Sequence, residues 1–419
     1  MKMFKNVVYL FGMQGVNYLI PLLTLPYLVR VLGPEYYGEY SFVIIIGQYC
    51  VMLTDFGFNL SSSAKIAKRN QDLDYICRVF TDTIYSKLCI GFIVSISVCI
   101  LISYIQDFKA VSDLIIISLL QVLGCIFTPV WLFQGIERMK SFAILTVSSK
   151  LLCLPLIFIF VKEQSDINYA VAINACVFLL SGIISIYLTR SLGIKFLSIR
   201  IKDIFNSVRE SSLIFIGTFS ISLYTLSTPI ILGLFSTSYE VGIFSAADKI
   251  RGALLGVFII LGNVFYPRVN NLLFSECREK GFNFIYKIIK YQFFISVIVS
   301  VIFFYMSPLI VKFYLGDKYF DSVILLKLMS PMIILIPMSV VLSNYILLPL
   351  GYKRYFSSIP VITSLIHIPC VIYFCRLYGA LGASISILLI ELLSFILLLL
   401  VNMKLGNISM IIKNRKEKI

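Results

Sequence analysis

Apolar stretches long enough to cross a lipid bilayer dominate this chain, and short basic segments separate them. Hydrophobic residues make up 59% of the 419 positions, and the mean hydropathy is +0.95. A hydrocarbon layer about 30 Å thick requires roughly 20 apolar residues for each helical crossing. The pattern predicts an all-α integral membrane protein with twelve crossings, at about 6–29, 41–63, 84–106, 111–134, 142–162, 168–189, 212–236, 241–266, 291–315, 322–348, 355–376 and 379–403.

The distribution of Lys and Arg indicates how these crossings are oriented. Short cytoplasmic loops are enriched in both residues. With the N-terminus inside, most of the 36 Lys and Arg fall in cytoplasmic segments. The outside segments hold only Arg30, Lys109, Lys162, Lys312, Lys318 and Arg376. We therefore predict an even number of crossings with both termini in the cytoplasm.

The net charge of +15 follows from this topology. The basic residues are spread over several short segments rather than gathered in one stripe, which argues against a nucleic-acid partner. The lipid bilayer is the expected partner, because basic loops attract anionic headgroups. Most of the ten cysteines lie inside predicted crossings, so no disulfide framework is expected. The first apolar stretch is too long for a cleavable signal peptide and is predicted to be the first crossing.

The sequence contains no recognisable catalytic constellation. The single histidine, His367, lies in the eleventh predicted crossing, so no histidine-based metal cluster or relay is expected. No glycine is followed by lysine, which excludes the P-loop motif. No hydrophilic segment is long enough to form a soluble catalytic domain. We therefore expect a transporter or a channel and not an enzyme, with no cofactor and no bound metal.

Two short sequence echoes suggest that the chain consists of two similar halves. Residues 37–41 after the first crossing resemble 241–245 after the seventh, and 135–138 after the fourth resemble 351–354 after the tenth. Such a parallel repeat places the substrate path between two lobes. The expected organisation is an N-terminal six-helix lobe at 1–190, a basic cytoplasmic connector at 191–210, a C-terminal six-helix lobe at 211–403 and a basic cytoplasmic tail at 404–419.

Ionisable residues inside the crossings are candidates for function. Such groups are costly in hydrocarbon and usually face the interior of the bundle or a water-filled cavity. They are Asp55, Lys87, Lys150, Asp248, Lys249, Arg251, Lys327 and Glu391.

Lys87 and Lys327 lie near the ends of their predicted crossings, so we expect their long side chains to reach the headgroups. Lys150 and Glu391 lie near the middle of theirs, with no partner within one helical turn.

Two pairs of these polar residues share a helix face. Asp55 and Asn59 are four positions apart in the second crossing. Asp248 and Arg251 are three apart in the eighth, and Lys249 lies beside them. The second pair has two interpretations: a buried ion pair that merely satisfies itself, or the charged wall of a central cavity. We favour the cavity wall, because the second and eighth crossings hold equivalent positions in the two halves.

Several motifs carry a resemblance to a known family. The most specific is Pro26-Tyr27-Leu28-Val29-Arg30-Val31-Leu32-Gly33-Pro34, which is preceded by Gln14-Gly15-Val16-Asn17-Tyr18. Asp55-Phe56-Gly57-Phe58-Asn59 and Trp131-Leu132-Phe133-Gln134-Gly135-Ile136-Glu137-Arg138-Met139 follow. The chain resembles the bacterial polysaccharide flippases of the Wzx type, in the superfamily that includes multidrug and toxin extrusion (MATE) proteins. The resemblance is dense over about 1–170 and matches the second half mainly in layout.

The resemblance implies a MATE-like fold in which two six-helix lobes open alternately to either side. It also implies a cargo: an oligosaccharide repeat unit, in particular of O-antigen, on an undecaprenyl pyrophosphate carrier. The flippase would move that unit from the cytoplasmic to the periplasmic leaflet of the bacterial inner membrane. A polysaccharide polymerase and a chain-length regulator are the expected partners.

This reading assigns hypothetical roles to the candidate residues. Cations attract pyrophosphate strongly in a medium of low dielectric constant, and Arg suits bidentate contact with phosphate. We expect positive potential for the pyrophosphate from Arg30, Lys150, Lys249 and Arg251. We expect charge balance, or transport of a coupling proton or cation, from Asp55, Asp248 and Glu391. We expect the sugar path to be lined by Gln14, Asn17, Tyr18 and Asn59.

Three alternatives compete with these assignments. Arg30 lies at the outside end of its crossing and equally suits a headgroup anchor. A multidrug or small-solute antiporter on the same scaffold is the main rival function, although the excess of Lys and Arg over carboxylates inside the crossings disfavours a cationic drug. A glycan polymerase or ligase is disfavoured because the outside loops are short and the only histidine is intramembrane.

Overall fold

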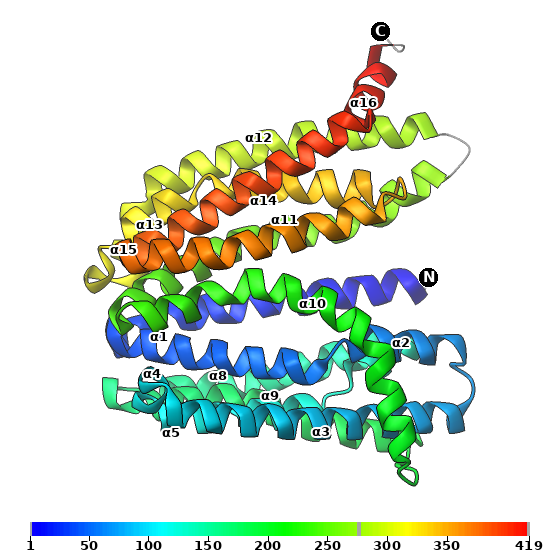
Figure 1. Cartoon of the computed structure of the whole chain (residues 1–419), viewed down its shortest axis with the longest axis vertical. Helices are drawn as coiled ribbons and strands as arrows, with labels where there is room; N and C mark the ends of the chain where they lie inside the picture. The colour runs from blue at the N-terminus through cyan, green and yellow to red at the C-terminus, as the bar shows by residue number, and fades with distance from the viewer. Residues whose placement is uncertain (1, 275–277, 417–419) are drawn as a thin grey trace. The chain divides into compact units, whose positions relative to one another are not determined.

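The computed structural model describes residues 2–274 and 278–416. Side chains at 2–14, 16–18, 220–221, 224–225, 263–264, 278 and 412–416 are outside that description. The described part of the chain is helical and contains no β-strand (Figure 1). It divides into two compact units, Met1–Leu234 and Phe235–Ile419.

The first unit is built from ten α-helices and one short 3-10 turn. They are α1 (Lys2–Asp55), α2 (Phe58–Lys68), α3 (Leu73–Tyr104), α4 (Gln106–Ala110), α5 (Ser112–Ser118), α6 (Leu120–Ile126), α7 (Val130–Gly135), α8 (Met139–Phe160), η1 (Gln164–Asp166), α9 (Ile167–Ser191) and α10 (Ile201–Phe235).

The described part of the second unit contains α-helices, two π-helical segments and one short 3-10 turn. Its elements are α11 (Ser238–Phe274), α12 (Arg278–Ile310), η2 (Val311–Leu315), η3 (Asp317–Tyr319), α13 (Ser322–Met329), α14 (Met332–Val340), η4 (Val341–Leu347), α15 (Lys353–Lys404) and α16 (Asn407–Lys416). The boundary between the two compact units falls at the end of α10.

Nine helical stretches of the described chain are long and apolar enough to cross a membrane. They are Leu19–Lys68, Leu73–Tyr104, Ser112–Gly135, Met139–Phe160, Gln164–Ser191, Ser238–Phe274, Glu279–Leu315, Ser322–Leu347 and Lys353–Lys404. The predicted seventh crossing falls in α10, whose apolar stretch Leu226–Phe235 is shorter.

The stretch Lys353–Lys404 contains two predicted crossings, and Leu19–Lys68 contains the second crossing and the end of the first. In both cases a glycine with non-helical backbone separates the two crossings. In α1 the break lies at Gly33 (φ 72°), which Pro34 follows. In α15 it lies at Gly379 (φ 53°), where the Glu240 carboxylate accepts a 2.6 Å hydrogen bond from the backbone N–H of Ala380. Glu240 thereby caps a helix segment that starts after a break.

Close helix packing in the first unit depends on small residues. A Cβ placed on Gly124 of α6 would lie 2.3 Å from the backbone carbonyl carbon of Phe178 in α9. One placed on Gly182 of α9 would lie 3.0 Å from the carbonyl oxygen of Gly124. The two backbones therefore touch, an approach that small residues permit between membrane helices.

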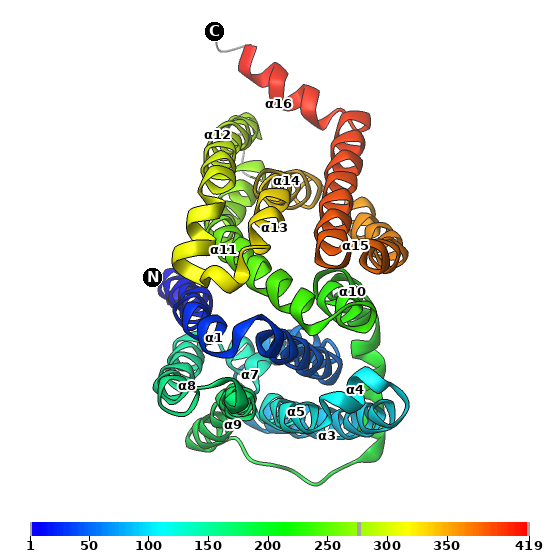
Figure 2. The same ribbon diagram turned by 90° about the vertical axis from the view of Figure 1, so that its left-hand side faces the viewer.

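The segment between α9 and α10 is extended, as Figure 2 shows, and part of it lies along α3. The backbone N–H of Leu197 donates to the Thr81 hydroxyl at 3.0 Å, and Arg78 donates to the Ser198 carbonyl at 2.8 Å. The Phe196 ring lies 5.0 Å from that of Phe80. Because α10 begins at Ile201, the second half of the predicted connector is helical.

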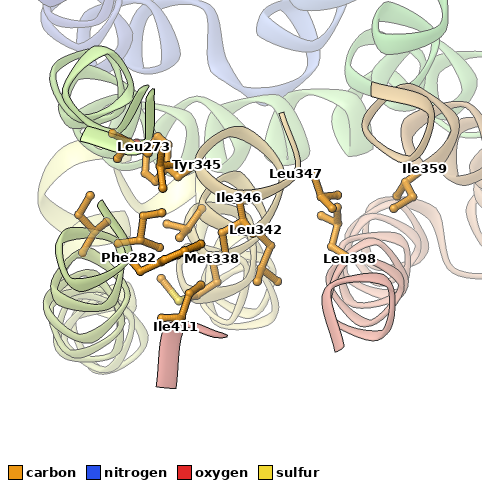
Figure 3. Close-up of a cluster of buried hydrophobic side chains, with 14 residues drawn as sticks. Leu273, Phe282, Met338, Leu342, Tyr345, Ile346, Leu347, Ile359, Leu398 and Ile411 are labelled. Carbon is orange, nitrogen blue, oxygen red and sulfur yellow. The ribbon is translucent and has the colours of Figure 1, made fainter. Parts of the chain in front are cut away.

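The core of the second unit gathers apolar residues from α11, α12, α14, η4, α15 and α16 (Figure 3). Met338, Leu342, Tyr345 and Ile346 lie at its centre, from the irregular second half of the predicted tenth crossing. The buried Asn402 amide donates a 2.8 Å hydrogen bond to the carbonyl of Leu398. The Asn407 amide in turn donates a 3.0 Å hydrogen bond to the side-chain oxygen of Asn402. These bonds fix the junction of α15 and α16 beside that core.

Candidate functional site

A helix break at Asp55–Gly57 is the most unusual backbone feature of the first unit. Asp55 ends α1, and α2 begins at Phe58. Phe56 has φ 40° and Gly57 has φ 76°, both in the left-handed region. Left-handed backbone is strained for a phenylalanine, and non-helical backbone at membrane depth is tolerated only where protein or a water-filled cavity surrounds it.

The α10 helix packs against this break. The Phe56 ring stacks on the Phe215 ring, with centroids 4.2 Å apart and planes 15° apart. A Cβ placed on Gly57 would lie 3.0 Å from the backbone nitrogen of Phe215. Packing against α10 therefore stabilises the break. A strained backbone persists in a folded protein when the surrounding structure supports it in this way.

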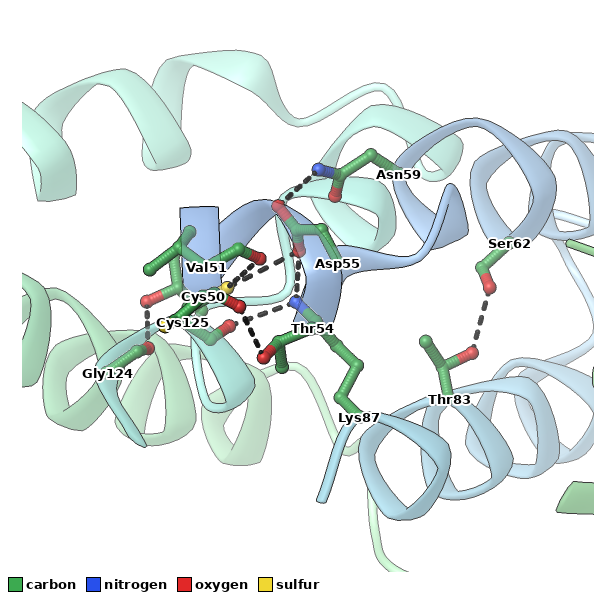
Figure 4. Close-up of polar contacts among 11 residues, drawn as sticks. Cys50, Val51, Thr54, Asp55, Asn59, Ser62, Thr83, Lys87, Gly124 and Cys125 are labelled. Atoms are coloured by element: carbon green, nitrogen blue, oxygen red, sulfur yellow. Dashed lines mark hydrogen bonds and ion pairs between the residues drawn. The ribbon is translucent and has the colours of Figure 1, made fainter. Parts of the chain in front are cut away.

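The side chain of Asp55 lies at the centre of a polar cluster (Figure 4). Its Oδ1 forms an ion pair with the Lys87 ammonium of α3 at 2.6 Å. Its Oδ2 accepts a hydrogen bond from the Asn59 amide of α2 at 3.1 Å. The Cys125 thiol of α6 donates to Oδ1 at 3.4 Å. Asp55 therefore joins residues of four helices.

Lys87 is completely buried, whereas the side chain of Asp55 is 27% exposed. The ammonium also donates to the Cys125 carbonyl at 3.0 Å. This placement corrects our expectation that Lys87 extends to the headgroups. The predicted crossing began at 84, but α3 begins at Leu73, where the Asp72 side chain caps it by accepting from the Tyr75 N–H. Lys87 thus lies about four turns inside the helix.

The second unit contains a different kind of ion pair. Asp248 and Arg251 of α11 are connected through Oδ1, which accepts from Arg251 Nη2 at 2.6 Å and from Nε at 3.0 Å. Arg251 Nη1 also donates to the sulfur of Met332 at 3.1 Å. The expected one-face pairing is confirmed. Both side chains remain partly accessible, at 34% for Asp248 and 14% for Arg251.

The remaining predicted cations differ in exposure. Arg30 and Lys249 are exposed, and Lys150 is half-buried in α8. Lys327 is half-buried, with its ammonium 5.5 Å from the centre of the Phe304 ring. Among the predicted carboxylates, Glu391 of α15 is buried at 8% exposure.

The residues predicted to line the sugar path are only partly described. The helix α1 passes through Gln14, Asn17 and Tyr18, but their side chains lie outside the described residues. Asn59 is half-buried, and its buried Oδ1 has no hydrogen-bond partner among the described residues. The Asn59 side-chain oxygen is therefore a buried acceptor, beside Asp55, whose hydrogen bond is not satisfied by the described residues.

No group of three His, Cys, Asp or Glu side chains that could hold a metal ion occurs among the described residues. His367, the single histidine, is buried in α15. The cluster around Asp55 is instead an arrangement of one carboxylate, one ammonium, one amide and one thiol. Such a set can hold charges in fixed positions and present a polar surface.

Comparison with known proteins identifies the relatives of this chain. Residues 3–273 match a family model described as polysaccharide biosynthesis protein. A putative O-antigen transporter of Escherichia coli (strain K12) is 34% identical over 397 residues, which cover 94% of this chain and 95% of the relative. A putative O-antigen transporter of Shigella dysenteriae is 31% identical, with coverage of 94% and 98%.

Solved structures with the same fold are membrane transporters. An inward closed structure of the lipid II flippase MurJ aligns with a TM-score of 0.72 at 13% identity, covering 98% of this chain and 90% of that one. An inward-facing MATE family multidrug resistance transporter aligns with a TM-score of 0.64 at 17% identity, covering 95% and 99%. The apolar spans and these relatives together make the chain a multi-pass membrane transport protein and not an enzyme. The chain belongs to the polysaccharide biosynthesis protein family.

Proposed function

We propose that this protein is a flippase for oligosaccharide repeat units, in particular those of O-antigen, linked to undecaprenyl pyrophosphate. It moves the units from the cytoplasmic to the periplasmic leaflet of the bacterial inner membrane. The observation that carries the proposal is the 34% identity to a putative O-antigen transporter over 94% of the chain. A fold shared with a lipid II flippase supports a lipid-linked cargo.

The proposed mechanism is alternating access by two six-helix lobes with twelve crossings and both termini in the cytoplasm. The two glycine breaks at Gly33 and Gly379 support the count, because each divides a stretch of 50 or 52 residues. A single crossing needs only roughly 20 residues. The excess of Lys and Arg in the predicted inner segments supports the orientation.

The cations of the chain supply the attraction for the pyrophosphate in this proposal. A pyrophosphate cannot cross hydrocarbon unaided, and guanidinium groups bind phosphate with two parallel hydrogen bonds. Arg251 is the strongest candidate, since it is only 14% exposed and its position is fixed by Asp248 and Met332. Arg30, Lys150 and Lys249 add positive potential.

Sugars require hydrogen-bond partners and aromatic faces. The unsatisfied Oδ1 of Asn59 supports a place for this residue on the sugar path, because a buried acceptor without a partner would gain from a donor hydroxyl. Gln14, Asn17 and Tyr18 belong to the same proposed path.

The energy for transport comes from an ion gradient or from consumption of the cargo in the periplasm. Asp248 and Glu391 are the proposed carriers of a coupling proton or cation, or they balance the charge of the cargo path. A polymerase and a chain-length regulator consume the delivered units and are the proposed partners.

The direct test is the leaflet distribution of lipid-linked repeat units in a bacterial strain that lacks this gene. We expect single units to accumulate on the cytoplasmic face and surface polymer to be lost, with both restored by the intact gene. Units that reach the periplasmic face without being polymerised would instead indicate a polymerase defect. Unchanged intermediates and unchanged polymer, in a strain without other flippases, would favour the small-solute antiporter.

A further inference from the structure

We propose that Lys87 is a built-in counter-ion that keeps Asp55 permanently paired, so that Asp55 does not carry a coupling ion. Its ammonium occupies the position that a free cation would need at this carboxylate. The proposal rests on the transport function proposed above and concerns one carboxylate of its machinery.

The contacts of the two charges support a permanent pair. Lys87 Nζ lies 2.6 Å from Asp55 Oδ1 and 3.0 Å from the Cys125 carbonyl oxygen. The second carboxylate oxygen accepts from Asn59 at 3.1 Å. Each oxygen of Asp55 therefore has a donor of its own, and the strongest donor is a full positive charge.

The burial of Lys87 is the second support. Its side chain has no exposed surface, whereas ordinary lysines near membrane boundaries extend to water. A buried ammonium without its carboxylate is strongly unfavourable, so separation of the pair during transport would leave an unpaired charge in the protein interior. The charge of Lys87 is useful in this position only while Asp55 faces it.

The location of the pair suggests what it does. Asp55 is the last residue of α1, directly before the left-handed pair Phe56 and Gly57. Lys87 belongs to α3, and Cys125 belongs to α6. The ion pair thus fixes the end of a broken helix to two neighbouring helices and places Asn59 beside it. In this role Lys87 is a positioning residue that acts through Asp55.

The test combines a double-mutant cycle with a transport assay on the full-length protein. The variants are Lys87→Met, Asp55→Asn and the double variant, each chosen to keep the side-chain size. The midpoint of thermal unfolding is measured for the purified wild type and the three variants. Surface polymer is measured for the same four forms in a strain that lacks its own transporter. Asp107→Asn with Lys109→Met is the matched control, since both residues are exposed on α4.

We expect Asp55→Asn to lower the midpoint by about 5–10 °C, because it leaves the fully buried Lys87 ammonium without its counter-ion. The double variant should recover at least half of that loss and restore surface polymer. Its response to an imposed proton or sodium gradient should equal that of the wild type. The control pair should change the midpoint by less than about 1 °C.

Two results would overturn the proposal. A double variant that is stable but delivers no polymer, or that no longer responds to the gradient, would show that Asp55 itself carries an ion or contacts the cargo. Additive losses of midpoint would show that the two charges are not coupled. Failure of the flippase function is distinguishable, because in that case the wild-type gene restores no polymer while the midpoint cycle still reports on the pair.

Discussion

Asp55–Lys87 and Asp248–Arg251 are two ion pairs with the same shortest distance and different consequences. Asp55–Lys87 and Asp248–Arg251 each have a nitrogen–oxygen separation of 2.6 Å. The first joins separate helices around a fully buried ammonium, and the second lies within one turn of α11. A charge paired across helices is part of the packing, whereas a pair within one turn moves with its helix. The cations also differ in exposure, at 0% for Lys87 and 14% for Arg251.

The backbone conformation also differs between the two ion pairs. Asp55 directly precedes two residues with left-handed backbone, Phe56 and Gly57, whereas Asp248 and Arg251 lie on a continuous helix. We infer that the first pair maintains the architecture of its unit and that the second is available to the cargo. The predictions below test this difference, beginning with the largest expected effect on stability.

Asp55→Asn should be the most destabilising single change at either pair, because it leaves the fully buried Lys87 ammonium without its carboxylate. Removal of one partner of a buried ion pair costs about 3–5 kcal/mol, because the other charge is left uncompensated. Reversible unfolding in mixed detergent micelles would measure the free energy of unfolding. If Asp248→Asn loses as much stability as Asp55→Asn, the two pairs do not differ in the way we describe.

Gly57→Ala should come next and should contrast with Gly252→Ala, the matched change beside Arg251. Gly57 has φ 76° and no room for a Cβ beside Phe215, so alanine should cost about 1–3 kcal/mol. A Cβ on Gly252 meets no described atom within 4 Å, so alanine there should stabilise the helix by about 0.5–1 kcal/mol. The same unfolding measurement decides both, and equal effects would contradict the strain at the break.

Arg251→Ala should lower the free energy of unfolding by only about 0.5–1 kcal/mol, because its partner stays partly hydrated. Under the proposed function it should nevertheless abolish surface polymer. Quantitative polymer staining, normalised to the amount of inserted protein, is the measurement. Normal polymer would remove Arg251 from the proposed pyrophosphate site.

Glu210→Gln should have the smallest effect and calibrates the series. Lys65 and Glu210 are also 2.6 Å apart, but their side chains are 29% and 56% exposed. Solvent and salt screen such pairs, so the loss should be below about 0.5 kcal/mol and should vanish at high salt. A larger loss would show that bond length alone predicts the strength of these ion pairs.

The local parts of the site followed from the sequence. The spacing of Asp248 and Arg251 predicted their pairing, because residues three apart share a helix face whatever the rest of the chain does. Asp55 and Asn59 were predicted to share a face of one helix, and that reason was wrong because the helix breaks between them. Their side chains nevertheless form a hydrogen bond across the break. The family motifs were also visible, and the comparisons confirm the family.

The role of Lys87 did not follow from the sequence. An apolar stretch shows where a helix enters the hydrocarbon layer, but it does not show where that helix begins. The helix α3 begins well before its apolar stretch. The Asp72 cap, with Asp74 in the first turn, was the available signal for that earlier start. The partner of Lys87 lies on another helix, and one helical sequence carries no information about its rotation against a neighbour.

Apolar periodicity and charge spacing thus determined by themselves the helical membrane class, most crossings and the pairs within one turn. These properties depend on interactions between residues close in the chain and on transfer from water to lipid. The tertiary structure decided the partner of Lys87, the left-handed break at Phe56 and Gly57, and the contacts of the connector with α3. These depend on the register between helices, which packing and buried polar contacts set across large separations in the chain.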